Sequence, residues 1–209
     1  MAKPFPVDSS PNLAQSIASR SASPYDRSGM AVPSGRRRTY RAATVVAFAA
    51  AAGTAPFFLL YGSTTGYTTI RVQRLIVSGP TLTAVAYHSI NLVKYSTVAS
   101  GGTSTALVQT PLDSLDGIAT ASLCSVYTAA PTAGTLVGTL SSRRHLAEAT
   151  TAVAAAQPPT IEFDLRGTGD DDTDRVLLRS SSEGIGLLFP AAPASAVTIA
   201  FEVEWTEEP

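Results

Sequence analysis

VTIAFEVEWT, residues 197–206, alternates apolar and polar side chains with the two-residue period of a β-strand. One face of that strand would carry Val197, Ile199, Phe201, Val203 and Trp205, and the other Thr198, Glu202, Glu204 and Thr206. A strand with one apolar and one charged face packs on a core and leaves its other face to solvent, as in antiparallel sheets. The segment therefore predicts an amphipathic antiparallel strand with Trp205 in the core.

Segments earlier in the chain show related strand patterns. Residues 160–166 (TIEFDLR) alternate, and residues 68–77 (TTIRVQRLIV) alternate up to a change of phase at Arg74-Leu75, which predicts a β-bulge. We expect Gly79-Pro80 to end that strand and residues 81–95 to form one long central strand. Shorter strands are predicted at residues 121–128, 136–140, 175–179 and 184–189.

Two stretches admit a second interpretation. Residues 42–60 (AATVVAFAAAAGTAPFFLL) are uncharged and long enough to span a membrane, but alanine dominates them and Gly53, Thr54 and Pro56 interrupt them. Two buried strands joined by a turn are therefore favoured over a membrane anchor. Residues 146–156 (LAEATTAVAAA) have the composition of a short helix or of an Ala-rich loop.

The spacing of these segments predicts an all-β fold. Roughly eight to ten short strands separated by turn residues are typical of a β-sandwich or a jelly roll. No long helices alternate with the strands, so a parallel α/β sheet is excluded. We therefore expect an antiparallel β-sandwich of jelly-roll type over residues 43–209, with a strand order that the sequence does not reveal.

Residues 1–42 read as a basic arm ahead of this domain. The arm holds seven basic residues against two acidic ones, a net charge of +5, whereas residues 43–209 carry a net charge of −6. It is rich in Ser, Pro and Arg and has no hydrophobic period, so we expect it to be extended or disordered until a partner orders it. Four clustered arginines are few for strong phosphate binding, so the predicted partner is a protein surface and nucleic acid is the alternative. The expected contact residues are Arg36, Arg37, Arg38 and Arg41.

The sequence gives little indication of catalysis, and we expect neither enzymatic activity nor a cofactor. The single cysteine, Cys124, excludes an intramolecular disulfide and a CxxC redox pair, and its place in an apolar run predicts a buried thiol. His88 lies within a predicted strand, as a core or interface residue, and His145 lies in a predicted loop. The GxSxG motif of serine hydrolases and the HExxH motif of zinc enzymes are absent.

GTGDDDTD, residues 167–174, is the one stretch whose composition suits an ion. It crowds Asp170, Asp171, Asp172 and Asp174 beside two glycines, and carboxylate oxygens are the ligands that Ca²⁺ takes. The spacing does not fit an EF-hand loop, so a solvated acidic hairpin tip is the favoured interpretation. The alternative is a metal site with Asp170, Asp172 and Asp174 as ligands.

Four segments carry a resemblance to a known group of proteins. They are IRVQRLIVSGPTLTAVAY (residues 70–87), TAAPTAGTLVGT (128–139), VLLRSSSEGIGLLF (176–189) and VTIAFEVEWTEE (197–208). Over residues 68–206, about two thirds of the chain, these segments resemble small structural proteins encoded among the head genes of tailed bacteriophages. The resemblance implies a virion component, such as a capsid decoration (cement) protein. It further implies a jelly-roll-like or β-tulip fold, a trimer on the capsid, terminal arms that staple neighbouring capsomers, and no catalytic residues.

The expected function follows from this resemblance. We expect a non-enzymatic cement protein that is assembled in the host cytoplasm and lies on the outer head surface of the virion. Its expected partners are the major capsid protein and further copies of itself as a homotrimer, with no membrane. The alternative is a tail fibre, spike or vertex protein whose β-sandwich binds a receptor or a glycan.

Overall fold

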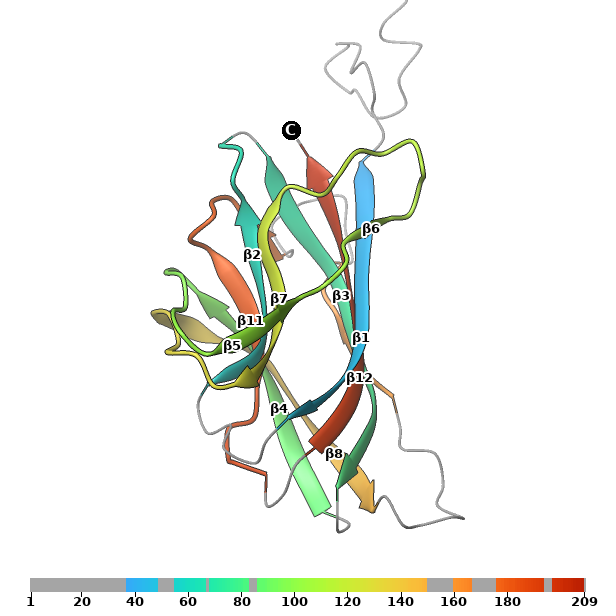
Figure 1. Cartoon of the computed structure of the whole chain (residues 1–209), viewed down its shortest axis with the longest axis vertical. Coiled ribbons are helices and arrows are strands. Elements are labelled where there is room, and N and C mark those ends of the chain that lie inside the picture. Colours follow the sequence, from blue (N-terminus) through green and yellow to red (C-terminus); the bar gives the residue numbers. More distant parts are fainter. Residues whose placement is uncertain are drawn as a thin grey trace, which may run out of the picture. The chain divides into compact units, whose positions relative to one another are not determined.

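The computed structural model describes residues 37–48, 55–66, 68–82, 86–149, 160–166, 176–193 and 197–208. Within these residues, the regular secondary structure consists of twelve β-strands (Figure 1). The first six are β1 (Arg38–Phe48), β2 (Pro56–Ser63), β3 (Thr69–Leu82), β4 (Ala86–Tyr95), β5 (Thr103–Ala106) and β6 (Thr110–Pro111). The others are β7 (Ala121–Ala129), β8 (Leu136–Ala149), β9 (Ile161–Asp164), β10 (Val176–Leu178), β11 (Gly184–Leu188) and β12 (Val197–Glu208). Among the described residues, no helix is long and apolar enough to cross a membrane.

The strands form two antiparallel sheets, an arrangement consistent with a β-sandwich. Sheet A has the order β6-β1-β12-β3, with β9 and β10 both paired to β3. Sheet B has the order β8-β4-β11-β2-β7-β5. A short parallel contact between β3 and β8, at Thr81–Glu148 and Leu82–Ala149, joins the two sheets at one side. The all-β prediction is therefore confirmed.

The pairing is nested along the chain. The first strand pairs with the last, β1 with β12, and the second pairs with the one before the last, β2 with β11. Towards the middle of the sequence, β3 pairs with β10 and β4 pairs with β8. The residues between β4 and β8 add strands to the outside, because β7 pairs with β2, β5 with β7 and β6 with β1. This connection therefore contacts both sheets.

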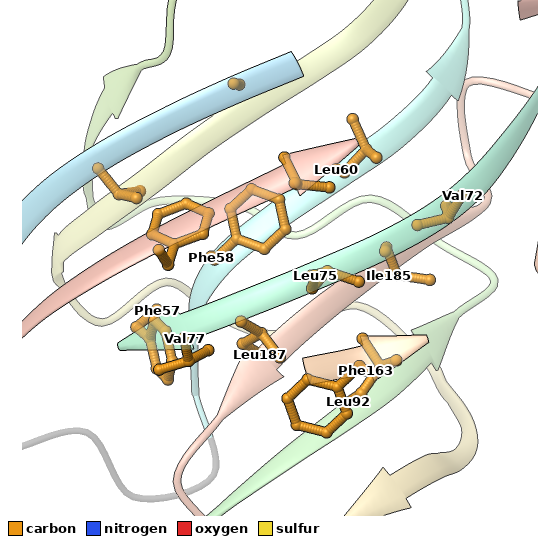
Figure 2. Packing of buried hydrophobic residues seen from close by; sticks show 14 of the residues in the cluster. Phe57, Phe58, Leu60, Val72, Leu75, Val77, Leu92, Phe163, Ile185 and Leu187 are labelled. Carbon is orange, nitrogen blue, oxygen red and sulfur yellow. The ribbon is translucent and has the colours of Figure 1, made fainter. Parts of the chain in front are cut away.

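The main core lies between the sheets, where side chains from both point toward one another (Figure 2). The rings of Phe58 and Phe201 bring β2 and β12 together, with centroids 4.7 Å apart. Trp205 is fully buried, as predicted, and its ring stacks on Tyr40 of β1 at 5.9 Å. The alternation of residues 197–205 is confirmed, because the apolar side chains of β12 are buried and those between them are half-buried.

A second, smaller cluster includes Tyr61 and Leu59 of β2. These side chains lie over the glycines of β11, and a Cβ atom at Gly184 would come within 2.6 Å of the Tyr61 ring. The Tyr61 hydroxyl accepts a hydrogen bond from the Ala99 amide at 2.8 Å. Because β2 contributes to both clusters, every one of its residues is buried, which explains its unbroken apolar run. The glycines of β11 therefore permit the close packing of these side chains.

The predicted bulge in β3 is confirmed, but the predicted end of that strand is wrong. The register with β12 shifts between Val72 and Arg74, which leaves Gln73 without a partner residue there. Strand β3 then continues past Gly79-Pro80 to Leu82, and the register shifts again at this dipeptide. Gly79 has φ of 58°, a left-handed conformation that suits glycine, so the dipeptide forms an irregularity within the strand.

Two further predictions are corrected by the strand bounds. The single strand expected over residues 81–95 is divided between the end of β3, in sheet A, and β4, in sheet B. The helix or loop expected from residue 146 is strand at least to Ala149, because β8 continues to that residue. His145 consequently lies in β8, opposite His88 of β4, and not in a loop.

Candidate docking surface

The connection between β6 and β7 exposes apolar side chains at one end of the folded domain. Leu112, Leu115 and Ile118 are 52%, 88% and 91% exposed, respectively. Single exposed apolar residues are normal on protein surfaces, and three within one short connection make this connection a candidate interaction site. We call residues 112–118 the docking loop.

A buried carboxylate fixes the C-terminal side of the docking loop. Glu207 of β12 is only 3% exposed. Its two oxygens accept hydrogen bonds from the Thr120 amide, at 2.9 and 3.0 Å, and one accepts from the Thr120 hydroxyl at 2.8 Å. The indole Nε1 of Trp205 donates to the same carboxylate at 3.1 Å. A buried carboxylate with several donors is well satisfied, so Thr120 is held firmly against β12.

Strand β1 fixes the rest of the docking loop. The Tyr40 hydroxyl donates to the Gly117 carbonyl at 3.0 Å, and the Leu112 amide donates to the Thr39 carbonyl at 2.9 Å. Burial, followed by the charge of Glu207, raises the pKa of Tyr40, so its hydroxyl stays protonated as a donor. These two hydrogen bonds attach the docking loop to β1 at Gly117 and at Leu112.

A turn within the docking loop sets its shape. The Leu115 amide donates to the Asp113 carboxylate at 2.8 Å, and the Asp116 amide donates to the Asp113 carbonyl at 2.9 Å. Because the loop is already ordered, little conformational entropy would be lost when its apolar side chains bind a partner. It lies at the end of the domain where β1 begins and β12 ends (Figure 1).

The predicted arm contacts divide between the folded domain and the residues outside it. The arm predicted from the sequence ends at residue 42, whereas β1 begins at Arg38. Arg38 and Arg41 therefore belong to the folded domain, Arg37 immediately precedes β1, and Arg36 lies outside the described residues.

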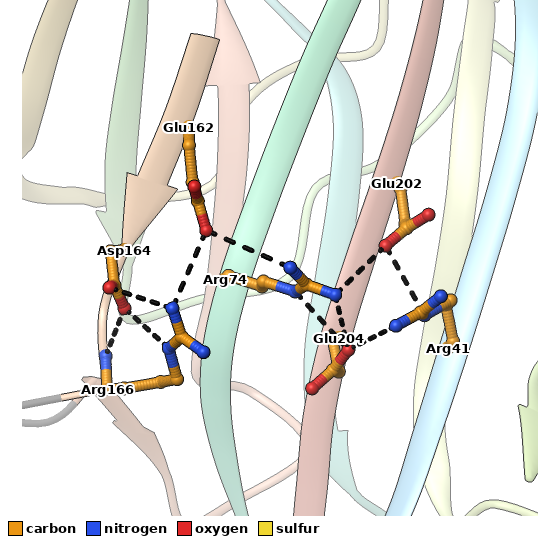
Figure 3. A network of polar contacts seen from close by, with 7 residues as sticks. All are labelled: Arg41, Arg74, Glu162, Asp164, Arg166, Glu202 and Glu204. Atoms are coloured by element: carbon orange, nitrogen blue, oxygen red, sulfur yellow. Dashed lines mark hydrogen bonds and ion pairs between the residues drawn. The ribbon is translucent and has the colours of Figure 1, made fainter. Parts of the chain in front are cut away.

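Arg41 takes part in a network of ion pairs on sheet A (Figure 3). Its guanidinium donates to Glu204 of β12 at 2.7 Å and lies 3.3 Å from Glu202. Arg74 of β3 contacts the same two carboxylates, at 3.2 and 3.7 Å. The network continues through Glu162, which is within 4 Å of both Arg74 and Arg166. Arg41 thus links β1 to β12, which explains why a basic residue belongs in this strand.

The network sets the protonation of its carboxylates. Burial alone would raise the pKa of Glu204, but hydrogen bonds and charges from Arg41 and Arg74 outweigh burial and lower it. The hydrogen bonds from Arg166 lower the pKa of Asp164. Both groups are therefore ionised at neutral pH, and the network is a structural feature of sheet A.

The remaining sequence candidates are the acidic cluster, His88 and Cys124. Asp170, Asp171, Asp172 and Asp174 lie outside the described residues. Among the described residues, no group of three His, Cys, Asp or Glu side chains could hold a metal ion. Burial lowers the pKa of His88, whose ring contacts Phe189, so this histidine is neutral near pH 7. Cys124 is buried as predicted, and burial raises the pKa of its thiol to about 12.

The docking loop was not predicted, although the sequence contains a signal for it. LDSLDGI, residues 112–118, repeats an apolar residue at every third position among turn-forming residues. That period fits neither a strand nor a helix, so these apolar side chains do not belong to one packed face. No local pattern indicated that Glu207 holds Thr120, because the two residues lie 87 positions apart in the sequence.

Comparison of the chain with protein-family models, with curated proteins and with solved structures finds no match.

Proposed function

We propose that the chain is a non-enzymatic virion structural protein, a decoration (cement) protein that binds the outer surface of a phage head. The observation that carries this proposal is the docking loop, an ordered apolar surface at the end of the domain where the chain enters β1. Residues 1–36, which precede β1 in the sequence, carry an excess of basic residues. The two elements together suit attachment to a large protein surface.

The strand order supports the jelly-roll part of the proposal. A jelly roll is a long antiparallel hairpin rolled up so that successive nested pairs alternate between two sheets. The pairs β1·β12 and β3·β10 lie in sheet A, and β2·β11 and β4·β8 lie in sheet B. Viral capsid domains use the jelly-roll fold, as do lectins and cupins, so the fold is compatible with a virion role.

The physical requirements of a decoration protein are met by a rigid domain with two attachment elements. Each element alone can bind weakly, because attachment at one places the other at high local concentration. The docking loop would contribute apolar burial, centred on Leu115 and Ile118. The basic residues before β1 would contribute contacts to an acidic capsid surface.

Binding of purified variants to particles that lack the chain tests the proposal. Deletion of residues 1–36 should leave a folded domain that binds much more weakly than the full chain. The deletion must stop there, because a longer one through residue 41 removes Tyr40, a buried core residue. Full occupancy after the deletion would contradict a role for the arm.

The docking loop is tested by the double variant Leu115→Ser and Ile118→Ser, which should lose at least tenfold in affinity for the particle. Val108→Ser is the matched control, because Val108 is also highly exposed, at 81%, but lies before β6. Equal binding by both variants would contradict the role of the loop. The alternative function, a tail fibre, spike or vertex protein, predicts binding away from the head shell.

A further inference from the structure

Among the described residues, one edge of strand β1 is unpaired for most of its length. Its first edge pairs with β12 over all eleven residues, Arg38–Phe48. Its second edge pairs with β6 only at Tyr40 and Arg41. Among the described strands, none pairs with this second edge over residues 42–48. We call residues 42–48 the β1 edge segment; its outward backbone N–H and C=O groups can pair with another strand.

The sequence of the β1 edge segment lacks the features that normally block strand pairing. AATVVAF contains no charge, no proline and no glycine. The register with β12 is unbroken, so no bulge turns the edge away. Val45 is 69% exposed, and Ala43 and Ala47 are exposed beside it. An uncharged and exposed strand edge is a pairing site wherever a suitable partner strand exists.

We propose that the β1 edge segment pairs in antiparallel orientation with the same segment of a second copy, across a two-fold axis at Val45. A two-fold contact brings identical surfaces together, so the segment must be complementary to itself. With the axis at Val45, Ala43 lies opposite Ala47 of the second copy. Val45 lies opposite its own equivalent, and no charged side chain of the segment faces another.

The position of β6 sets the extent of this contact. Because β6 occupies the edge at Tyr40 and Arg41, a second strand can pair only from Ala42 onward. Val45 is the midpoint of the segment from Ala42 to Phe48. In the antiparallel pair, the two copies of β6 lie at opposite ends, so neither copy blocks the other. Sheet A of one copy then continues into sheet A of the second.

A second copy is the occupant that best fits the edge. It supplies a strand of the same length and the same uncharged character, and it is free at its own edge. One pair of short strands buries less than the roughly 1,600 Å² of a standard interface, so we expect weak dimers, with dissociation constants of roughly micromolar to millimolar size. The two-fold contact gives a dimer, in contrast to the trimer implied by the phage resemblance.

Sedimentation equilibrium of the full chain over a wide concentration range tests the proposal. The unmodified chain should form dimers, and Val45→Lys should weaken dimerisation at least tenfold, because two ammonium groups would lie directly opposite one another in the strand pair. Val108→Lys is the matched control and should dimerise like the unmodified chain. Far-ultraviolet circular dichroism checks that both variants fold. A chain that is monomeric at every concentration, or trimeric, would overturn the proposal.

Disulfide trapping tests the position of the axis independently of folding effects. Directly opposite residues of an antiparallel pair have Cβ atoms about 4.5–5.5 Å apart, so Val45→Cys should form a disulfide between copies. Ala43→Cys should not, because its equivalent lies about four residues away along the strand, roughly 13 Å. Equal trapping at both positions would overturn the proposal. So would loss of dimers on deletion of residues 1–36, which would identify the arm as the occupant. Neither experiment depends on binding to a phage particle, so this inference and the proposed function can fail separately.

Discussion

Among the described residues, two edge strands of the sandwich, β1 in sheet A and β8 in sheet B, differ in how their unpaired edges are protected. The register between β8 and β4 shifts twice, so that Val137 and Leu140 are extra residues on the edge strand. Exposed Arg143 and Arg144 follow these irregularities, and Arg144 lies over the Tyr87 ring at 4.8 Å. Bulges and charges are the usual protection of an edge strand. The β1 edge segment has neither, so it can accept a partner strand more readily than β8 can.

The same two strands differ in how the core holds them. Tyr40 and Ala42 of β1 are fully or almost fully buried, and Arg41 is paired with β12. By contrast, most side chains from Leu136 to Arg144 of β8 are exposed on either face. We infer that packing against the core holds β1 in place, whereas residues 136–144 of β8 contribute little to the core.

The largest expected effect is on folding stability at β1. Tyr40→Ala removes a buried ring that stacks on Trp205 and a hydrogen bond to the docking loop, so it should lower the free energy of unfolding by about 3–5 kcal/mol. Leu140→Ala in β8 should cost no more than about 0.5–1 kcal/mol, because the side chain is largely exposed. Urea unfolding of both variants measures the difference. Similar losses would contradict the contrast between the strands.

An intermediate effect on the free energy of unfolding is expected when the pH is lowered. The folded-state pKa of Glu204 lies below its unfolded value, so the stabilisation by this group is complete above the ordinary glutamate pKa of about 4.3. It is lost as the pH falls through the lower folded pKa. Glu204→Gln should lower the free energy of unfolding at pH 7 by about 1–2 kcal/mol, because hydrogen bonds from Arg41 and Arg74 lose their charged acceptor.

The pH dependence of unfolding checks this prediction. Between pH 7 and pH values below about 4, the unmodified chain should lose more stability than Glu204→Gln does. Glu162→Gln is a suitable control, because its side chain is more exposed than that of Glu204. Parallel acid profiles for the unmodified chain and Glu204→Gln would show that the network does not stabilise the β1–β12 pairing.

The smallest effect is expected on self-association through the edge of β8. The double variant Arg143→Ser and Arg144→Ser removes two charges from β8 but leaves both register shifts. Self-association measured by sedimentation should therefore change by less than about threefold, since the bulges still interrupt strand pairing. Strong new association through β8 would show that the arginines alone protect this edge.

The sequence predicted those strands whose two faces differ in polarity. The alternation in β12 and the change of phase in β3 arise from packing one face on the core, so they leave a local pattern. The change of sheet between β3 and β4 was not predicted, because the residues between them, Thr83, Ala84 and Val85, include no glycine or proline. Both flanking segments are apolar, so they read as one strand.

The start of β1 and the docking loop depend on contacts between distant parts of the chain. Arg38 and Arg41 read as arm residues, because the acidic residues that pair with Arg41 lie in β12. The docking loop is fixed by Tyr40 and Glu207, which are far from it in the sequence. Only the spacing of Leu112, Leu115 and Ile118 at every third position could be recognised in the local sequence.

If the proposed role is correct, the chain is a component of a phage particle, and the most direct test is the number of its copies in such particles after purification. Quantitative mass spectrometry against the major capsid protein gives this ratio. We predict a ratio of one or of a simple fraction, as expected for a protein that covers the head shell. A handful of copies per particle, or none, would contradict a decoration protein, and a handful would favour a tail or vertex protein.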